Sequence, residues 1–499
     1  MPDYDVIVIG AGLGGLTSGA LCSHRGRKTL VLEQGDLVGG CCSTFEKDGY
    51  HFDVGASVVE VIGSIVNAMA DMGVEVGEVM DLIPCDPIYD YILKDGTRFQ
   101  FPVSVEETTE VIKKVAPQDA AAWPGFAAYM KEFIAIATDA VFGSPMVTFA
   151  DVARMFVKHP ALLKFGPLFT GSYQDVIFHW FKTEAMRQTA AYQSFYAGLP
   201  PELAGGTYAL LGYSEHEGVW YPRGGMIKIP EAFQRVGERH GMEVRTGCRV
   251  VQVIIREGRV AGVILDDGTE ITAPLVISNI NAMTLYLDLI GEQYMPRLTR
   301  VGIKSYRPSM SVPMVYLGVD YEPELEAHHT LVTLPMEEMD EYWWNVYEKG
   351  RLPDRMFGLV CWPTESDPAL APEGHHVVNL ILTPGPYRLE GTDWDSEKEA
   401  LIDRSIQFFT EKAMPGLADH VKIAEISTPL DYERKLLHPE GAIYGLSEET
   451  TASLCFRPSA RSKFIEGLYL TGASTHPGGG VPAAVASGRI AADLIDRYE

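Results

Sequence analysis

The chain has few cysteines and few basic residues for its length. Its 499 residues contain seven scattered cysteines, an odd number without the regular spacing of a disulfide framework. Its 41 Lys and Arg face 67 Asp and Glu, which leaves a net charge of −26 at pH 7. Because a protein that binds nucleic acid needs a basic surface to neutralise phosphates, we expect no nucleic-acid partner.

Long apolar runs are also missing. No stretch reaches a length of about 18 uncharged apolar residues, which a membrane-spanning helix needs. The first residues do not look like a secretory signal, since Asp3 and Asp5 stand where basic residues would be and the run DVIVIG is too short. With the scattered cysteines, these absences indicate a reducing compartment, and we expect a cytoplasmic protein.

A strand, a glycine loop and a helix open the chain. Residues 5–10, DVIVIG, form an apolar run typical of a strand buried on both faces of a parallel sheet. Gly10, Gly12 and Gly15 follow as G-x-G-x-x-G, and helix-compatible residues then lead to KTLVLE, which predicts a second strand at residues 28–33. These glycines permit a tight turn, close approach of a pyrophosphate and close helix–strand packing, while the helix N-terminus presents N–H groups to phosphates. The context predicts a dinucleotide-binding βαβ unit.

An acidic residue ends the second predicted strand. Glu33 lies 18 residues beyond Gly15, and its carboxylate can accept hydrogen bonds from the 2′- and 3′-hydroxyls of a ribose. An acid at this position disfavours a 2′-phosphate. Up to this residue, the pattern leaves FAD and NAD open as the cofactor.

Three further segments carry a family resemblance. After Glu33, a short spacer and the pair Gly39-Gly40 resemble the extended FAD signature of glutathione reductase-like flavoproteins. The stretch VGGCCSTFEKDGYHFDVGASVV resembles the flavoproteins that include bacterial phytoene desaturases, carotenoid cis-trans isomerases and retinol saturases. GVWYPRGGMIKIPEAFQRVGERHG and the closing EGLYLTGASTHPGGGVPAAVASGRIAADLI are similar to the same family. The resemblance implies that the cofactor is FAD.

The resemblance also implies which residues lie around FAD. Gly39 and Gly40 would approach the cofactor with their backbone, Gly55 would lie near the flavin ring, and Val250 would meet the adenine through backbone atoms. The full set implied is Gly10, Gly12, Leu13, Gly14, Gly15, Glu33, Gln34, Gly39, Gly40, Cys41, Ser43, Thr44, Gly55, Ala56, Ser57, Gly225, Val250, Asn279, Gly472, Gly480, Val481 and Pro482. Proline is well suited to start the last helix, because its missing N–H has no helical partner there.

The expected fold class is α/β, with a Rossmann-like, glutathione reductase-like FAD-binding domain. Its discontinuous segments are expected at 1–85, 222–285 and 455–499. Alternation of polar and apolar residues with turn signals at Glu257-Gly258 and Asp267-Gly268 predicts an antiparallel β-meander inserted into this domain. By elimination, 86–221 and 286–454 supply a mixed α+β substrate domain. The closing glycine loop would complete the same FAD domain, because no acid follows it on a further strand.

One part of the predicted substrate domain has an excess of basic residues, although the chain as a whole is acidic. Residues 149–182 are rich in Phe, Leu, Val and Met, and their neighbourhood has a local basic excess. This pattern is typical of interfacial helices that touch anionic lipid, although a buried helical subdomain with solvated basic residues stays open as the alternative. We expect peripheral contact with the inner face of the membrane. The basic residues are Arg154, Lys158, Lys164, Lys182 and Arg187, against Asp151, Asp175 and Glu184.

The resemblance implies an FAD-dependent oxidoreductase that acts on a long apolar isoprenoid or carotenoid-like polyene. Desaturation would transfer a hydride from an allylic carbon to flavin N5, with proton loss from the neighbouring carbon and a quinone or oxygen as electron acceptor. An isomerase or saturase that uses reduced FAD stays open, because Cys41 stands where phytoene desaturases usually have arginine. An amine oxidase-like flavoenzyme and a non-catalytic, FAD-stabilised carotenoid-binding protein are further alternatives.

Few side chains stand out as catalytic candidates. His476 lies in the closing loop and is either a flavin-side participant or a residue that shapes the turn before Pro477. Nothing in the sequence distinguishes Asp175 and Glu215, possible acids of the substrate domain, from solvated charges. The adjacent cysteines Cys41 and Cys42 are expected to be packing residues. This scarcity suits a reaction in which the cofactor supplies the chemistry.

Two pairs of adjacent histidines raise the question of a metal site. The pairs are His328-His329 and His375-His376. Neighbouring side chains on a strand point to opposite faces, so neither pair is expected to chelate together. We therefore predict no metal.

Overall fold

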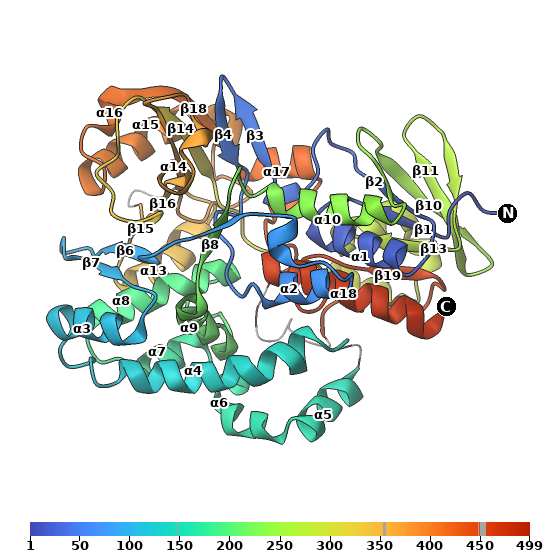
Figure 1. Ribbon diagram of the computed structural model, residues 1–499, viewed down its shortest axis with the longest axis horizontal. Coiled ribbons are helices and arrows are strands. Elements are labelled where there is room, and N and C mark those ends of the chain that lie inside the picture. Colours follow the sequence, from blue (N-terminus) through green and yellow to red (C-terminus); the bar gives the residue numbers. More distant parts are fainter. Residues whose placement is uncertain (147, 353–355, 448, 450–455) are drawn as a thin grey trace.

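A five-stranded parallel sheet organises one lobe of the protein (Figure 1). The structure is a computed structural model that describes residues 1–146, 148–352, 356–447, 449 and 456–499. The strand order is β19-β13-β1-β2-β9, so strands from the beginning, middle and end of the chain lie side by side. The strands are β1 (Val6–Ile9), β2 (Thr29–Leu32), β9 (Glu243–Arg245), β13 (Leu275–Ser278) and β19 (Leu468–Leu470).

Helices from both chain ends cover this sheet. Helix α1 (Leu13–His24) packs against α18 (Val481–Tyr498) and α10 (Lys228–Arg239). Figure 1 shows the blue α1 beside the red α18, although their residues are separated by almost the whole chain. The approach is close, because a Cβ built on Gly488 of α18 would lie 2.5 Å from the backbone oxygen of Gly14.

The predicted meander is present as a separate three-stranded antiparallel sheet. It consists of β10 (Val250–Arg256), β11 (Arg259–Leu265) and β12 (Glu270–Thr272), and it leads directly into β13. Together with the parallel sheet, it confirms the expected α/β class and the inserted meander.

A mixed seven-stranded sheet forms the core of the second lobe, at the upper left of Figure 1. Only β15 and β6 pair in parallel within it. Alternate residues face two cores: Leu331 faces the core that reaches the parallel sheet, whereas Val332 packs with the residues of α15 (Trp394–Lys412). In sheet order the strands are β18 (Val421–Ser427), β14 (Met314–Val319), β17 (His376–Ile381), β16 (Gly358–Cys361), β15 (His329–Val332), β6 (Tyr89–Ile92) and β7 (Arg98–Phe101).

A layer of helices lies below the seven-stranded sheet in Figure 1 and extends toward the middle of the view. It contains α3 (Val105–Val115), α4 (Trp123–Ala137), α5 (Phe149–Lys158), α6 (Gly166–Thr170), α7 (Tyr173–Trp180), α8 (Glu184–Tyr192) and α9 (Leu211–Ser214). Among the described residues, no helix combines the length and the apolar character needed to cross a membrane.

Two short strand pairs and seven further α-helices complete the described structure. The strand pairs are β3 (Thr44–Lys47) with β4 (Tyr50–Asp53), and β5 (Leu82–Pro84) with β8 (Trp220–Pro222). The remaining α-helices are α2 (Gly63–Ala70), α11 (Ala282–Thr284), α12 (Arg297–Ser305), α13 (Met336–Tyr342), α14 (Pro363–Ser366), α16 (Leu417–His420) and α17 (Pro429–Leu436). All five parallel strands fall within the segments expected for the FAD domain, and all seven mixed strands fall outside them. The domain boundaries themselves stay a prediction.

The close contact of α1 with α18 leads to a stability prediction. Gly488→Val should lower the free energy of unfolding by about 1–3 kcal/mol, because the new side chain forces the backbone of the two helices apart. Thermal and urea unfolding measure the change. The control is Gly302→Ala in α12, where a Cβ meets no atom within 4 Å, and which should be neutral or stabilising because alanine favours helix. Equal stability of Gly488→Val and wild type would contradict the packing described here.

Candidate functional site

The opening glycine loop lies at the carboxyl end of β1. Gly12 caps α1 without a side chain, so the first N–H groups of this helix are free to meet an anion. A Cβ on Gly12 would lie 2.5 Å from the Nδ2 atom of Asn279, and one on Gly15 would lie 2.1 Å from the backbone oxygen of Gly10. The loop therefore has the tight approach that a pyrophosphate cradle requires. Leu13 and Gly14 form the first turn of the helix behind it.

Glu33 reaches back to this loop from the end of β2. Its Oε2 atom accepts a hydrogen bond from the Ala11 N–H at 2.8 Å, and its Oε1 atom accepts one from the Gly35 N–H at 2.9 Å. Its backbone oxygen accepts from the Cys248 N–H at 2.7 Å, which brings the start of β10 at Val250 close to the same strand end. The next residue, Gln34, donates from Nε2 to the backbone oxygen of Lys435 at 3.0 Å.

A second loop joins the first. The Gly39 N–H donates to the Ala11 oxygen at 2.8 Å, which places Gly39 and Gly40 beside the opening loop. The Ala56 N–H donates to the Cys41 oxygen at 3.0 Å, so the segment that holds Gly55, Ala56 and Ser57 lies against residues 39–44. The buried Ser43 hydroxyl has no partner among the described residues. An orphaned hydroxyl beside an uncapped helix fits a phosphate-containing cofactor.

Asp53 ties these loops together, and the sequence-based reasoning missed it. Its Oδ1 atom accepts hydrogen bonds from the Thr44 hydroxyl at 2.6 Å and from the Met226 N–H at 2.9 Å, and its Oδ2 atom accepts one from the Tyr221 hydroxyl at 2.7 Å. Burial raises the pKa of Asp53 to about 6, although these hydrogen bonds favour its ionised form. Gly225 is held between Tyr221 and Met226 by this network. The available signal was an acid between the apolar residues Phe52 and Val54.

The closing loop meets the opening loop over Asn279. Gly472 follows β19 and donates its N–H to the Ser487 hydroxyl at 2.7 Å. A Cβ on Gly14 would lie 2.7 Å from this N–H and 2.8 Å from the Oδ1 atom of Asn279. Gly480 caps α18 without a side chain, and Val481 and Pro482 begin that helix. The structure therefore brings the implied FAD residues from five segments to one region, while their contact with FAD stays a prediction.

His476 lies buried between this loop and the helical layer. Its side chain is 3% exposed, and its Nε2 atom lies 2.8 Å from the backbone oxygen of Val141. Burial lowers the pKa of His476 to about 4, so the ring is neutral at pH 7. With Nε2 donating to the carbonyl, Nδ1 is an acceptor, and it has no partner among the described residues. A role beside the flavin stays a prediction.

The geometric argument against a His328-His329 pair was wrong. One ring nitrogen of each histidine and the Cys361 sulfur all lie within 4.8 Å of one another. His328 precedes the first residue of β15, so strand alternation does not separate the two rings. Burial raises the pKa of the Cys361 thiol well above its usual value and lowers the pKa of both histidines. The expectation of no metal is untested by this geometry and stays a prediction.

The expectation for Glu215 was also wrong. Its side chain is only 3% exposed, in a short 3₁₀ turn (Glu215–Glu217) after α9. Asp175, by contrast, has a local structural role, because its carboxylate accepts hydrogen bonds from the Ser172 N–H at 2.8 Å and the Ser172 hydroxyl at 2.9 Å. That pair caps α7.

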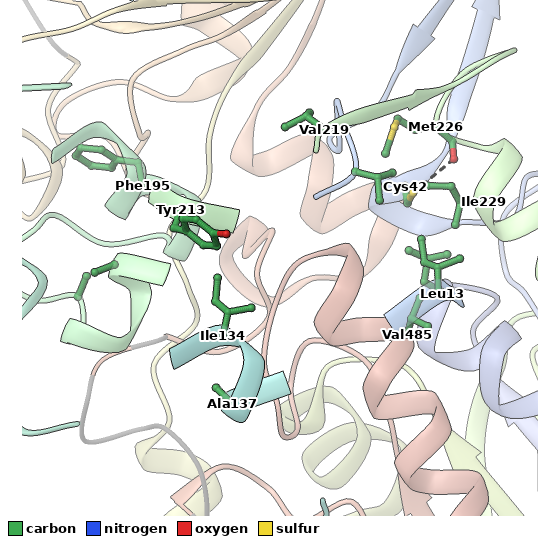
Figure 2. Close-up of a cluster of buried hydrophobic side chains, with 14 of the residues drawn as sticks. Leu13, Cys42, Ile134, Ala137, Phe195, Tyr213, Val219, Met226, Ile229 and Val485 are labelled. Atoms are coloured by element: carbon green, nitrogen blue, oxygen red, sulfur yellow. Dashed lines mark hydrogen bonds between the residues drawn. The ribbon is translucent and has the colours of Figure 1, made fainter. Parts of the chain in front are cut away.

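Apolar side chains line the boundary between the lobes. In Figure 2, one group belongs to the lobe of the parallel sheet, and the other belongs to the helical layer. Both groups are part of one continuous buried cluster. The first group includes Leu13, Cys42, Met226, Ile229 and Val485, and the second includes Ile134, Ala137, Phe195 and Tyr213. A boundary with few polar groups suits an apolar ligand.

Comparison with known proteins identifies the family. The model of the family described as flavin-containing amine oxidoreductase matches residues 13–496. A phytoene desaturase of Fusarium fujikuroi is 30% identical over 98% of this chain and 89% of its own. The neurosporene-forming phytoene desaturase of Rhodobacter capsulatus is 28% identical over 98% and 93%. The lycopene-forming enzyme of Pseudescherichia vulneris is 29% identical over 98% of both chains.

Solved structures agree on the fold. An oxidoreductase from Methanosarcina mazei has a TM-score of 0.63 at 17% identity, with 99% of this chain and 100% of that chain covered. Putrescine oxidase bound to putrescine has a TM-score of 0.63 at 15% identity, with 99% of both chains covered. The family match, the relatives and the shared fold establish an FAD-dependent oxidoreductase, and the chain belongs to the flavin-containing amine oxidoreductase family.

Proposed function

We propose that this protein desaturates a long, apolar isoprenoid or carotenoid-like polyene with FAD as the cofactor. The observation that carries the proposal is the likeness to proteins named phytoene desaturase, which extends over 98% of this chain. The apolar boundary between the lobes supports it, because a hydrocarbon substrate offers almost no polar group to recognise.

The loops described above supply groups suited to each part of FAD. The free N–H groups at the start of α1 suit the pyrophosphate, and Glu33 suits the adenosine ribose. Ser43, Thr44 and the start of α18 suit the ribityl side, and the segment 55–57 suits the ring. When bound, FAD supplies the two-electron oxidation. A quinone or dioxygen is the proposed final electron acceptor.

Cofactor binding is tested by substitution at Gly12. Gly12→Val should abolish FAD retention, because the added side chain meets Asn279 and closes the pyrophosphate cradle. Flavin absorbance of the purified protein measures retention, and circular dichroism shows whether the variant is folded. Gly77→Val is the matched control, since Gly77 is exposed and a Cβ there meets no atom within 4 Å. A folded Gly12→Val protein that keeps its FAD would refute this placement of the pyrophosphate.

The reaction itself is tested by product mass. The holoprotein is incubated with phytoene, a poly-cis lycopene and retinol, each with a quinone or under oxygen and each with and without reductant. Desaturation predicts loss of two hydrogens per step from phytoene, dependent on the acceptor. An unchanged mass with an altered absorption spectrum would indicate isomerisation, and a gain of two hydrogens would indicate saturation. Either of these results would contradict desaturation.

We also propose that α5 and the turn after it contact a membrane surface. Phe149, Val157 and Leu163 are 70%, 79% and 68% exposed, respectively. Arg154 and Lys164 lie in the same segments, and each forms an ion pair with an acidic neighbour. Exposed apolar side chains beside cations are typical of an interfacial helix, and α5 lies at the outer edge of the helical layer in Figure 1. This contact would give an apolar substrate a route from lipid.

Vesicle binding tests this surface. Co-sedimentation with vesicles that contain anionic phospholipid should exceed that with neutral vesicles, and it should weaken as salt rises. Replacing Phe149, Val157 and Leu163 together by serine should lower binding at least about tenfold, because each loses buried apolar area in the lipid. Val251→Ser, at an exposed apolar site on the meander, should bind like wild type. Failure of the wild-type protein to bind anionic vesicles at low salt would refute the proposal.

A further inference from the structure

Two glutamates meet inside the second lobe, close to the apolar boundary. Glu60 is partly buried and follows Val59, whose N–H and C=O exchange hydrogen bonds of 2.8 and 3.0 Å with the backbone of Trp220. Glu215 is 3% exposed and lies five residues before Trp220. The hydroxyl of Ser214, the residue before Glu215, lies 3.3 Å from the Oε2 atom of Glu60, so the two glutamates are neighbours. Burial, and then the negative charge of Glu60, raise the pKa of Glu215.

Uncharged polar side chains surround the pair. The Tyr89 hydroxyl lies 3.3 Å from the Oε1 atom of Glu60, and the Ser214 hydroxyl lies 3.3 Å from its Oε2 atom. Tyr89 and Gln193 are also hydrogen-bond neighbours of Glu215, so Tyr89 joins both carboxyl groups. The titratable and polar groups around the pair are Tyr89 and Tyr91 of β6, Gln193 and Tyr196 of the turn after α8, Ser214 of α9 and His329 of β15.

These neighbours cannot satisfy two ionised carboxylates. Each hydroxyl has one proton, yet the Tyr89 hydroxyl also lies 3.2 Å from that of Tyr196, and the Ser214 hydroxyl also lies 3.1 Å from the Leu211 oxygen. The buried Oε1 atom of Glu215 has no partner among the described residues. No Lys or Arg in the described part of the chain contributes to the pKa of either group.

A proton held between the two carboxyl groups would resolve this shortage. Burial raises the pKa of both glutamates, and the charge of Glu60 raises the pKa of Glu215 further. Two acids at one site then hold one proton in common, because like charges in an apolar setting cannot both ionise. Glu215 is the more deeply buried of the two, so it is the member that keeps the proton.

We propose that Glu60 and Glu215 share one proton and that Glu60, as carboxylate, accepts the proton that the substrate loses. This inference rests on the proposed desaturation. Its second support is position: Glu60 lies three residues after Ser57, on the segment proposed to face the flavin ring, and Glu215 lies two residues after Tyr213 of the apolar boundary. Glu60 is partly exposed, whereas Glu215 is buried.

The proposed step balances as follows. One substrate carbon gives a hydride, with both electrons of its C–H bond, to the oxidised flavin. The C–H bond of the neighbouring carbon breaks, its two electrons form the new double bond, and its proton goes to the Glu60 carboxylate. FAD, when bound, would supply this two-electron oxidation, and the quinone or dioxygen would finally take up the two electrons with two protons. One of these protons came with the hydride, and the other is equivalent to the proton that Glu60 releases to water before the next turnover.

Flavin reduction tests the role of Glu60. Anaerobic holoenzyme is mixed with phytoene in detergent, and bleaching of the flavin absorbance is followed over a range of pH. Glu60→Gln should slow reduction at least about 100-fold, because general-base catalysis typically contributes that much or more. Glu60→Asp should restore part of the rate, and both variants should keep their FAD. A Glu60→Gln enzyme that reduces its flavin as fast as wild type would overturn this role.

Thermal unfolding tests the shared proton without any turnover. The native pair binds more protons than the unfolded chain, so the melting temperature should fall as pH rises from about 4.3, the usual glutamate pKa. Glu60→Gln and Glu215→Gln should each weaken this fall, because one carboxyl group alone is not forced to share a proton. The control is Glu341→Gln, at an exposed position of α13, which should follow the wild-type slope. Equal slopes in all four proteins would overturn the shared proton.

A comparison of phytoene and putrescine as substrates distinguishes failure of this inference from failure of the proposed function. If wild type reduces its flavin with phytoene but Glu60→Gln is unimpaired, desaturation stands and the role of Glu60 fails. If putrescine reduces the flavin and phytoene does not, both proposals fail. The carboxylate pair, among its tyrosines, would then be assigned to binding an ammonium group.

Discussion

The carboxylate of Asp53 is the contact on which the geometry of the site depends. It receives hydrogen bonds from Thr44, Tyr221 and Met226, so one buried acid joins the loop after Gly40, the strand β8 and the segment that starts α10. Burying a charge is costly unless it is well hydrogen-bonded. Three donors meet that requirement and leave the acid few alternative arrangements. This buried hydrogen-bond network therefore holds together the loops that are proposed to contact the flavin.

A buried carboxyl group also lies in the second lobe, at Glu215. Asp53 has donors for both of its oxygens, whereas Glu215 retains an oxygen without a partner among the described residues. This difference supports a positioning role for Asp53 and a proton-binding role for the glutamate pair. A buried carboxyl group whose oxygen lacks a hydrogen-bond donor is stabilised by holding a proton.

The local elements could be predicted from the sequence. The strand before Gly10, the helix after Gly12, the strand that ends at Glu33 and the meander all depend on short-range patterns of apolar residues, glycines and turns. The resemblance then related the opening and closing loops, and the structure shows that they meet over Asn279. The failures have a common origin. Glu215 and the pair His328-His329 were judged from their neighbours in sequence, although burial and contact depend on residues far along the chain.

The sequence by itself determined the class of the fold and the kind of cofactor, because a pyrophosphate cradle needs particular residues at fixed short spacings. The sequence also showed that few side chains are candidates for catalysis. Only the tertiary structure decided that Asp53, Tyr221 and Met226 share one network, and that Glu60 and Glu215 face one tyrosine. The physical reason is that a carboxyl group takes its protonation state from its surroundings, and those surroundings exist only after the chain has folded.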